Sequence, residues 1–338
     1  MTSIEPLSLS ELRELSRDHG AAAAFSPLTG RAWFLFEAGA RRLPVADGVR
    51  IAGWLRSLPC PTIGLFPVGG HTHLRRACDV VLENHDEVKA LLPNLQKNPL
   101  AATVFVQLLR ATEKMEIEAA LTGESLAYAT LQSGPEFKAW LAQFRPDAVR
   151  ITDTGPPVLV ERHGNTVALV LNRASNRNAI SVEVRDALAE SLQLVLSDPT
   201  IKKLNISGRG RCFSVGGDLN EFGTVPDPVT GYLVRNLALP GRLLALCADR
   251  AEVHVHGACI GAGIEFPAFA GRVVAGPDAF FQLPELKFGL IPGAGGCVSI
   301  ARRIGRQNLA QWVIAGRRVN AQQALQWGLV DEIAPLPD

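Results

Sequence analysis

The chain has 338 residues, of which 47% are hydrophobic and 20% charged, a balance that excludes an intrinsically disordered protein. Lys and Arg total 34 against 33 Asp and Glu, so the net charge of +1 gives no overall attraction for nucleic acid or an anionic membrane. A length above that of one typical hydrophobic core predicts two units of ~150 residues each.

The six cysteines are scattered, without a C-x-x-C pair or the regular spacing of a disulfide framework or zinc site. This spacing predicts reduced thiols and no metal. The sequence MTSIEPLSLSELRELSRDHG at the start carries acidic side chains where an export signal has a basic segment and an apolar core. No run of the sequence reaches the ~18 apolar residues of a membrane span. We therefore expect a cytoplasmic protein.

The first part of the chain has a mixed α/β pattern. Leucines at helical spacing and short apolar runs bounded by Gly and Pro predict a helix at 8–19 and strands at 31–37 and 61–67. The pattern then becomes helical, and Asn98 followed by a proline is typical of a helix start. Two further helices are expected at 116–132 and 136–144.

A segment rich in Pro, Gly and polar residues, 145–157, interrupts every period and predicts a linker. We therefore divide the chain into an N-terminal region, 1–150, and a second domain, 157–338. The elements expected in the second domain are a hairpin of strands 158–161 and 166–171, a helix at 182–196 and a strand at 201–207. Strands that alternate with helices indicate a layered α/β domain.

Two glycine-rich segments each follow a predicted strand. In 208–222 small residues make the chain turn tightly and leave backbone N–H groups uncovered, which suits an anion or a carbonyl oxygen. In 253–266 a helix is expected to begin near Ala262, where unpaired N–H donors and a positive dipole end coincide. Glu265 falls in its first turn, so its carboxylate either complements the dipole or takes part in chemistry.

A third segment, 280–296, carries one carboxylate in an otherwise apolar stretch. Glu285 stands between Pro284 and Leu286. Since carboxylates are rarely buried without a partner or a function, Glu285 is either a salt-bridged structural residue or a functional one.

The order of these segments resembles the crotonase superfamily, the enoyl-CoA hydratase/isomerase family. The matching pieces are LNRASNRNAIS, GRGRCFSVGGDL, HGACIGAGIEF, LPELKFGLIPGAGG and AGRRVNAQQALQWGLVDEI. The resemblance implies a crotonase-type α/β core of ββα repeats wound into a spiral, with a mixed N-terminal region ending in a helical lid. It also implies an acyl-CoA thioester substrate, no cofactor besides the CoA of that substrate, and a homo-oligomer, either a trimer or a hexamer.

By this resemblance the backbone N–H groups of Val215 and Ala262 form an oxyanion hole for the thioester carbonyl. Glu265 would activate water for attack at Cβ, and Glu285 would deliver a proton to Cα. Both glutamates are retained, which favours addition or removal of water across the 2,3 double bond. Isomerisation, thioester hydrolysis, cofactor-free oxygenation and non-catalytic acyl-CoA binding are the alternatives.

The resemblance also assigns substrate-binding positions. Arg173 and Ala174 lie in the loop that follows the CoA nucleotide in relatives. Further substrate-binding residues are expected along the backbone at the thioester end and at the second oxyanion position. They are Val215, Gly216, Gly217, Asp218 and Ala262. Asp218 is equally suited to be a helix N-cap in a turn.

The segment 98–146 looks like the helical tail that relatives carry after their catalytic core, although here it lies before the core. Upstream, LRSLPCPTIGLFP and ACDVVLEN resemble the central strand and the Cys-Asp strand of the family, and the second domain has Ala270 and Gly271 in place of Cys-Asp. We therefore expect a fusion or permutation, in which a degenerate crotonase-like half supplies the lid and each chain has one active site.

Overall fold

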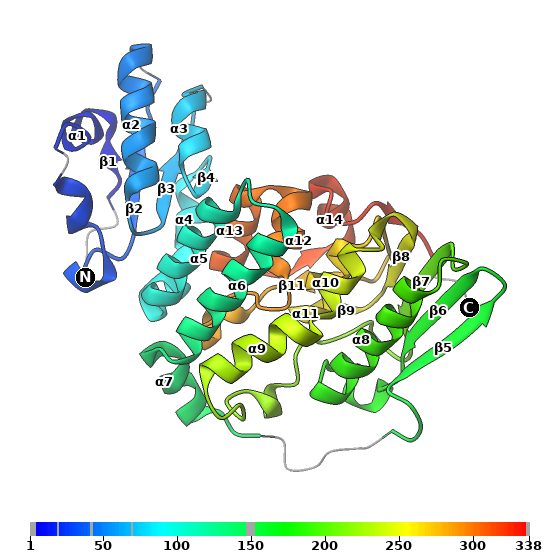
Figure 1. The fold of residues 1–338 in the computed structure, drawn as a ribbon. Helices are drawn as coiled ribbons and strands as arrows, with labels where there is room; N and C mark the ends of the chain where they lie inside the picture. Colours follow the sequence, from blue (N-terminus) through cyan, green and yellow to red (C-terminus); the bar gives the residue numbers. More distant parts are fainter. Residues whose placement is uncertain (1–4, 19, 41–42, 69, 147–152, 336–338) are drawn as a thin grey trace.

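The computed structural model of the protein describes residues 5–18, 20–40, 43–68, 70–146 and 153–335. It has three sheets and helices packed around them, so the expected mixed α/β class is confirmed (Figure 1). The segment predicted as a linker, 145–157, falls partly outside the described residues. In the described part of the chain, none of the helices combines the length and the apolar character needed to cross a bilayer.

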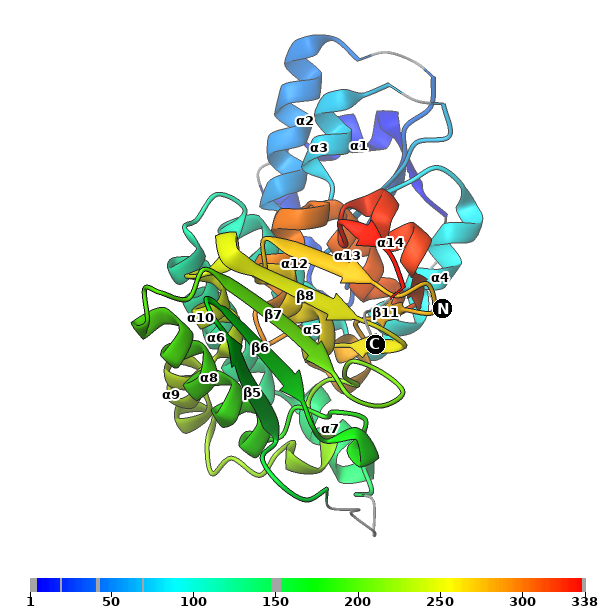
Figure 2. The same cartoon turned by 90° about the vertical axis from the view of Figure 1, so that its right-hand side faces the viewer.

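The largest sheet belongs to the second half of the chain. Its six strands lie in the order β13-β10-β8-β7-β6-β5. Only β5 and β6 pair antiparallel, as the predicted hairpin. The strands are β5 (Val158–His163), β6 (Thr166–Leu171), β7 (Lys203–Gly208), β8 (Ala251–Val255), β10 (Arg272–Ala275) and β13 (Glu332–Ile333). Figure 2 shows β5 to β8 side by side.

A smaller sheet of three strands leads directly to the glycine-rich segments. It joins β9 (Ala258–Ile260), β11 (Phe280–Gln282) and β12 (Val319–Asn320) in the order β12-β11-β9. The helices around the two sheets are α8 (Val182–Ser197), α9 (Pro228–Ala238), α10 (Pro240–Ala245), α11 (Ala262–Glu265), α12 (Gly296–Ile304), α13 (Arg306–Ala315) and α14 (Ala321–Trp327).

The N-terminal region begins with a parallel sheet in the order β1-β2-β3-β4. Its strands are β1 (Leu7–Ser8), β2 (Phe34–Glu37), β3 (Thr62–Leu65) and β4 (Val80–Leu82). Its helices are α1 (Leu9–Leu15), α2 (Val45–Ser57), α3 (Thr72–Ala77), α4 (His85–Lys97), α5 (Pro99–Thr112), α6 (Ile117–Gln132) and α7 (Pro135–Gln143). The sequence patterns did not predict α2, where Ile51, Trp54 and Leu55 are buried at helical spacing but two glycines weaken the helix signal.

The buried side chains form two clusters. The boundary between the clusters does not coincide with the predicted linker, 145–157. The smaller cluster lies between Leu12 and Cys78. The larger one runs from Leu35 through α4 to α7 and on to Val330, so these helices share a core with the second half. The ring of Trp140 lies 4.9 Å from that of Phe288. Figure 1 shows α5 and α6 against α12 and α13. That this arrangement arose by fusion or permutation stays a prediction.

One buried carboxylate joins the N-terminal sheet to the second half. Asp79, just before β4, accepts hydrogen bonds from the backbone and hydroxyl of Thr62, both at 2.9 Å. The same carboxylate pairs with Arg110 of α5 and, at 2.9 Å, with Arg306 of α13. All three charged side chains are nearly inaccessible to solvent. Without Asp79, Arg110 would be buried without a carboxylate partner among the described residues, and Arg306 would keep only its 3.4 Å contact with Glu113.

We expect Asp79→Ala to lower the free energy of unfolding by ~3–5 kcal/mol, because breaking a buried ion pair from one side leaves uncompensated charge. Urea denaturation followed by circular dichroism measures this change. The control is Glu83→Ala, since Glu83 is exposed and lies 3.6 Å from Arg75; its effect should stay within about 1 kcal/mol. Equal losses for the two variants would contradict the structural role of Asp79.

Candidate active site

A cavity of about 710 Å³ lies where the glycine-rich segments meet α6 and α9. It brings together seven of the predicted site residues, which are Val215, Gly216, Gly217, Asp218, Ala262, Glu265 and Glu285. Arg173 and Ala174 are not among the residues that line it. Three segments separated in the sequence therefore meet in one place, as the motif order predicted.

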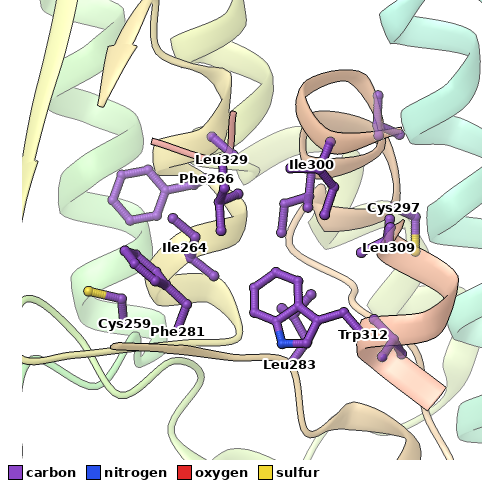
Figure 3. Packing of buried hydrophobic residues seen from close by; sticks show 14 of the residues in the cluster. Cys259, Ile264, Phe266, Phe281, Leu283, Cys297, Ile300, Leu309, Trp312 and Leu329 are labelled. Carbon is purple, nitrogen blue, oxygen red and sulfur yellow. The ribbon is translucent and has the colours of Figure 1, made fainter. Parts of the chain in front are cut away.

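Glu265 stands at the end of the single-turn helix α11. Gly261 precedes the helix with φ 50° and ψ −123°, a conformation that only glycine adopts without strain. Pro267 follows, and the chain continues as a 3-10 turn. Figure 3 shows the neighbours Ile264 and Phe266 packed with Phe281 in the hydrophobic core. This packing holds the helix in place while Glu265 lines the cavity.

The two oxygens of Glu265 have different surroundings. Oε2 accepts hydrogen bonds from the backbone N–H groups of Ala294 at 2.7 Å and Gly296 at 3.0 Å. Oε1 lies 3.7 Å from the point where a Cβ on Gly261 would stand. Burial raises the pKa of Glu265 to about 7, although both N–H donors favour the charged form. Glu265 is therefore close to half ionised at neutral pH, with Oε1 left for a ligand.

Glu285 approaches the same glycine from another element, the 3-10 turn Glu285–Phe288. Its Oε1 lies 2.7 Å from the position of a Cβ on Gly261. Its Oε2 is buried and has no hydrogen-bond partner among the described residues. Burial raises the pKa of Glu285 well above its ordinary value, and the charge of Glu265 raises it further. Glu285 is thus held protonated beside a carboxylate that can ionise.

A third buried carboxylate, Glu124 of α6, was not predicted from the sequence. It accepts hydrogen bonds from Gly295 N–H at 2.7 Å and Cys297 N–H at 2.9 Å. Four consecutive amides, 294 to 297, thus donate alternately to Glu265 and Glu124, which together cap the start of α12. Burial and the charge of Glu265 raise the pKa of Glu124 to about 8. Its position on the buried stripe of α6, three residues after Leu121, is the signal that could have revealed it.

The two predicted oxyanion donors differ in this structure. The N–H of Ala262 at the start of α11 makes no hydrogen bond to any residue that the structure describes. The N–H of Val215 donates to the carbonyl oxygen of Arg177 at 3.2 Å. A substrate oxygen could therefore take the Ala262 donor directly, whereas at Val215 it would have to replace the Arg177 carbonyl.

The remaining predicted residues have local structural partners. Asp218 caps the 3-10 turn Leu219–Glu221 by accepting a hydrogen bond from Asn220 N–H at 3.0 Å. Arg173 forms an ion pair with Glu183 at 2.6 Å. Ala174 begins the 3-10 turn Ala174–Asn176. Asp218 thus serves as a cap while it also lines the cavity.

Within the described ranges, no three His, Cys, Asp or Glu side chains are grouped as ligands for a metal ion. The six cysteine thiols are all buried and unpaired. Burial raises the pKa of the thiols of Cys259 and Cys297, so both are neutral at physiological pH.

Comparison with known proteins shows a family for the second half of the chain. Residues 161–338 match the family described as enoyl-CoA hydratase/isomerase. A 2,3-dehydroadipyl-CoA hydratase from Escherichia coli (strain K12) is 34% identical over 184 residues, covering 53% of this chain and 69% of that protein. A 1,2-epoxyphenylacetyl-CoA isomerase from the same organism is 33% identical over 171 residues, covering 49% and 65%.

Among solved structures, an enoyl-CoA hydratase from Thermoplasma volcanium GSS1 is 32% identical. The match covers 53% of this chain and 72% of that one, with a TM-score of 0.48. The family match includes both glutamates of the cavity and the glycine-rich segments around them. This chain is a member of the enoyl-CoA hydratase/isomerase family.

Proposed function

We propose that the chain adds water to, or removes it from, the 2,3 double bond of an acyl-CoA thioester. The observation that carries this proposal is a pair of buried carboxyl groups that reach one glycine, Gly261, from separate elements. Burial raises the pKa of both carboxyl groups, but two backbone amides offset part of this effect at Glu265, so Glu265 ionises before Glu285. Hydration needs such a pair, one group to take a proton and one to give a proton.

In the proposed reaction, Glu265 Oε1 takes a proton from water as the water oxygen bonds to Cβ. The electron pair of the double bond moves toward the thioester, and Glu285 gives its proton to Cα. The N–H of Ala262 stabilises the enolate-like oxygen, because a donor that the fold already holds in position needs no reorganisation. The N–H of Val215 becomes the second donor to this oxygen once the thioester oxygen replaces the carbonyl oxygen of Arg177 as its acceptor. Coenzyme A is part of the substrate, and no other cofactor takes part.

The named activities of the relatives support this reaction class without fixing the reaction. One relative is named a hydratase and another an isomerase, at similar identity. The presence of both Glu265 and Glu285 favours hydration, since hydration uses an acid and a base together. We keep a homo-oligomer, a trimer or hexamer, as a further proposal that sedimentation velocity tests.

The test is a screen of the purified protein against crotonyl-CoA and longer and aromatic 2-enoyl-CoA thioesters. Loss of the conjugated thioester absorbance, with the 3-hydroxyacyl product identified by mass spectrometry, is the expected result. A product with a shifted double bond would indicate an isomerase instead. Tight binding of every thioester without turnover would overturn the proposal and favour a non-catalytic binder. The hydrogen bond that the Val215 N–H already makes to the carbonyl oxygen of Arg177 is the observation that favours this alternative.

The proposed roles set a pH dependence. Glu265 must be ionised to act as the base, and its pKa is about 7. We therefore expect kcat/KM for hydration to fall about tenfold for each pH unit below 7. Glu285 must be protonated, and its raised pKa keeps it so above neutral pH, so loss of its proton lowers activity only on the alkaline side. A profile that stays flat from pH 5 to 8, with unchanged circular dichroism, would contradict Glu265 as the base.

A further inference from the structure

Two arginines line the cavity, and they differ in how their charge is balanced. Arg185 forms an ion pair with Asp186 at 2.7 Å. Arg235 of α9 has no carboxylate within ion-pair distance among the described residues. Its Nε is buried and makes no hydrogen bond to them either. A largely buried cation without a counter-ion is costly, so its position calls for a partner.

The guanidinium of Arg235 is held by groups that orient it without neutralising it. Its central carbon lies 4.3 Å from the centre of the Tyr128 ring, a cation–π contact. Its Nη2 donates to Gln132 Oε1 at 3.2 Å. Tyr128 and Gln132 stand one turn apart on α6, and the Tyr128 ring packs so closely on Gly293 that a side chain there would collide with it. The guanidinium plane is therefore fixed in advance of any ligand.

Glu124 does not account for this cation. The charge of Arg235 lowers the pKa of Glu124 slightly against its burial, so the two groups sense each other. Both oxygens of Glu124 are nevertheless taken by backbone amides. A guanidinium has five N–H donors, and in the described part of the chain Arg235 uses one of them. The buried Nε–H cannot be reached from the cavity, so Nη1 and the second N–H of Nη2 are the donors left for a molecule there.

We infer that Arg235, with Gln132 beside it, binds a carboxylate at the far end of the acyl group, so that the substrates are CoA thioesters of dicarboxylic 2-enoic acids. The inference rests on the proposed function, because it assumes that the acyl group enters the cavity beside Glu265 and Glu285. The planar guanidinium suits a carboxylate, with which it forms two parallel hydrogen bonds. Four apolar side chains that also line the cavity, Val225, Val234, Leu239 and Phe288, suit the methylene groups that separate the two ends of such a substrate.

The test compares pairs of trans-2-enoyl-CoA thioesters of six, eight and ten acyl carbons, in which one member ends in a methyl group and the other in a carboxylate. We expect the wild-type protein to favour the carboxylate at one length by on the order of 10–100-fold in kcat/KM, the range of a charged hydrogen bond. Arg235→Met should remove this preference, and Arg235→Lys should retain part of it. The control is Arg242→Met, because Arg242 pairs with Glu118 and does not line the cavity; its preference should equal that of the wild type.

Calorimetric binding of the corresponding saturated acyl-CoA pairs separates this inference from the proposed function. A binding preference for the carboxylate that Arg235→Met removes, in protein with an unchanged melting temperature, supports the inference even if no thioester is hydrated. Equal affinity for both members at every length, or a preference that survives Arg235→Met, overturns it even if hydration is fast. Failure to hydrate either series, with binding intact, counts against the proposed function alone.

Discussion

Replacing Glu285 with glutamine is expected to lower kcat for hydration by on the order of 10²–10⁴-fold, the usual contribution of a positioned acid. Glutamine has nearly the same shape, so it keeps the packing around Gly261, but it cannot give up a proton to Cα. Binding of the thioester should change little, because the amide of Ala262 and the walls of the cavity remain. Steady-state rates from the loss of enoyl absorbance measure the effect, and calorimetry with a saturated acyl-CoA measures binding.

The matched control is Glu118→Gln, which makes the same chemical change at a half-exposed glutamate paired with Arg242. It should leave both kcat and binding at the wild-type level. Retention of more than a tenth of the activity by Glu285→Gln would mean that the proton reaches Cα from another group. Glu124 is then the next acid to test, because burial and the charge of Glu265 raise its pKa to about 8.

The site residues that could be predicted are those that their neighbours in the sequence mark. Glu265 follows a run of small residues that ends a strand, and Glu285 interrupts an apolar stretch. Both signals extend over a dozen residues, and the structure places both side chains in one cavity. The helix expected near Ala262 is present but lasts a single turn, because Pro267 follows it closely.

Residues whose roles depend on contacts between distant segments were missed. Glu124 bonds to Gly295, 171 positions later in the chain, so no local pattern reveals that its partner is a loop of the cavity. Arg235 lies in a stretch of sequence that matches no motif, and its contacts with Tyr128 and Gln132 come from a helix far away in the chain. The hydrogen bond from Val215 to Arg177 is likewise a long-range one, which a motif that names only Val215 does not contain.

Replacing Gly261 with alanine is expected to lower kcat/KM by about 10²-fold or more and also to destabilise the fold. The backbone at Gly261, with φ 50° and ψ −123°, costs ~1–3 kcal/mol for any residue with a Cβ. The new methyl group would stand 2.7 Å from Glu285 Oε1, so this carboxyl group would have to shift from its place beside Glu265. A displacement of about 1 Å at a reacting group can cost 10²-fold in rate. Hydration rates and thermal unfolding measure the two effects separately.

Gly305→Ala separates backbone strain from crowding of the carboxyl groups. Gly305 also has a positive φ, 81°, but no atom of the described residues lies within 4 Å of the Cβ that alanine would add. This variant should lose stability comparable to that lost at Gly261 while its hydration rate per folded molecule stays at the wild-type level. If Gly261→Ala also keeps that rate, the two glutamates do not need the space that the glycine leaves. If only Gly261→Ala loses it, the absence of a side chain at this position is a requirement of the chemistry itself.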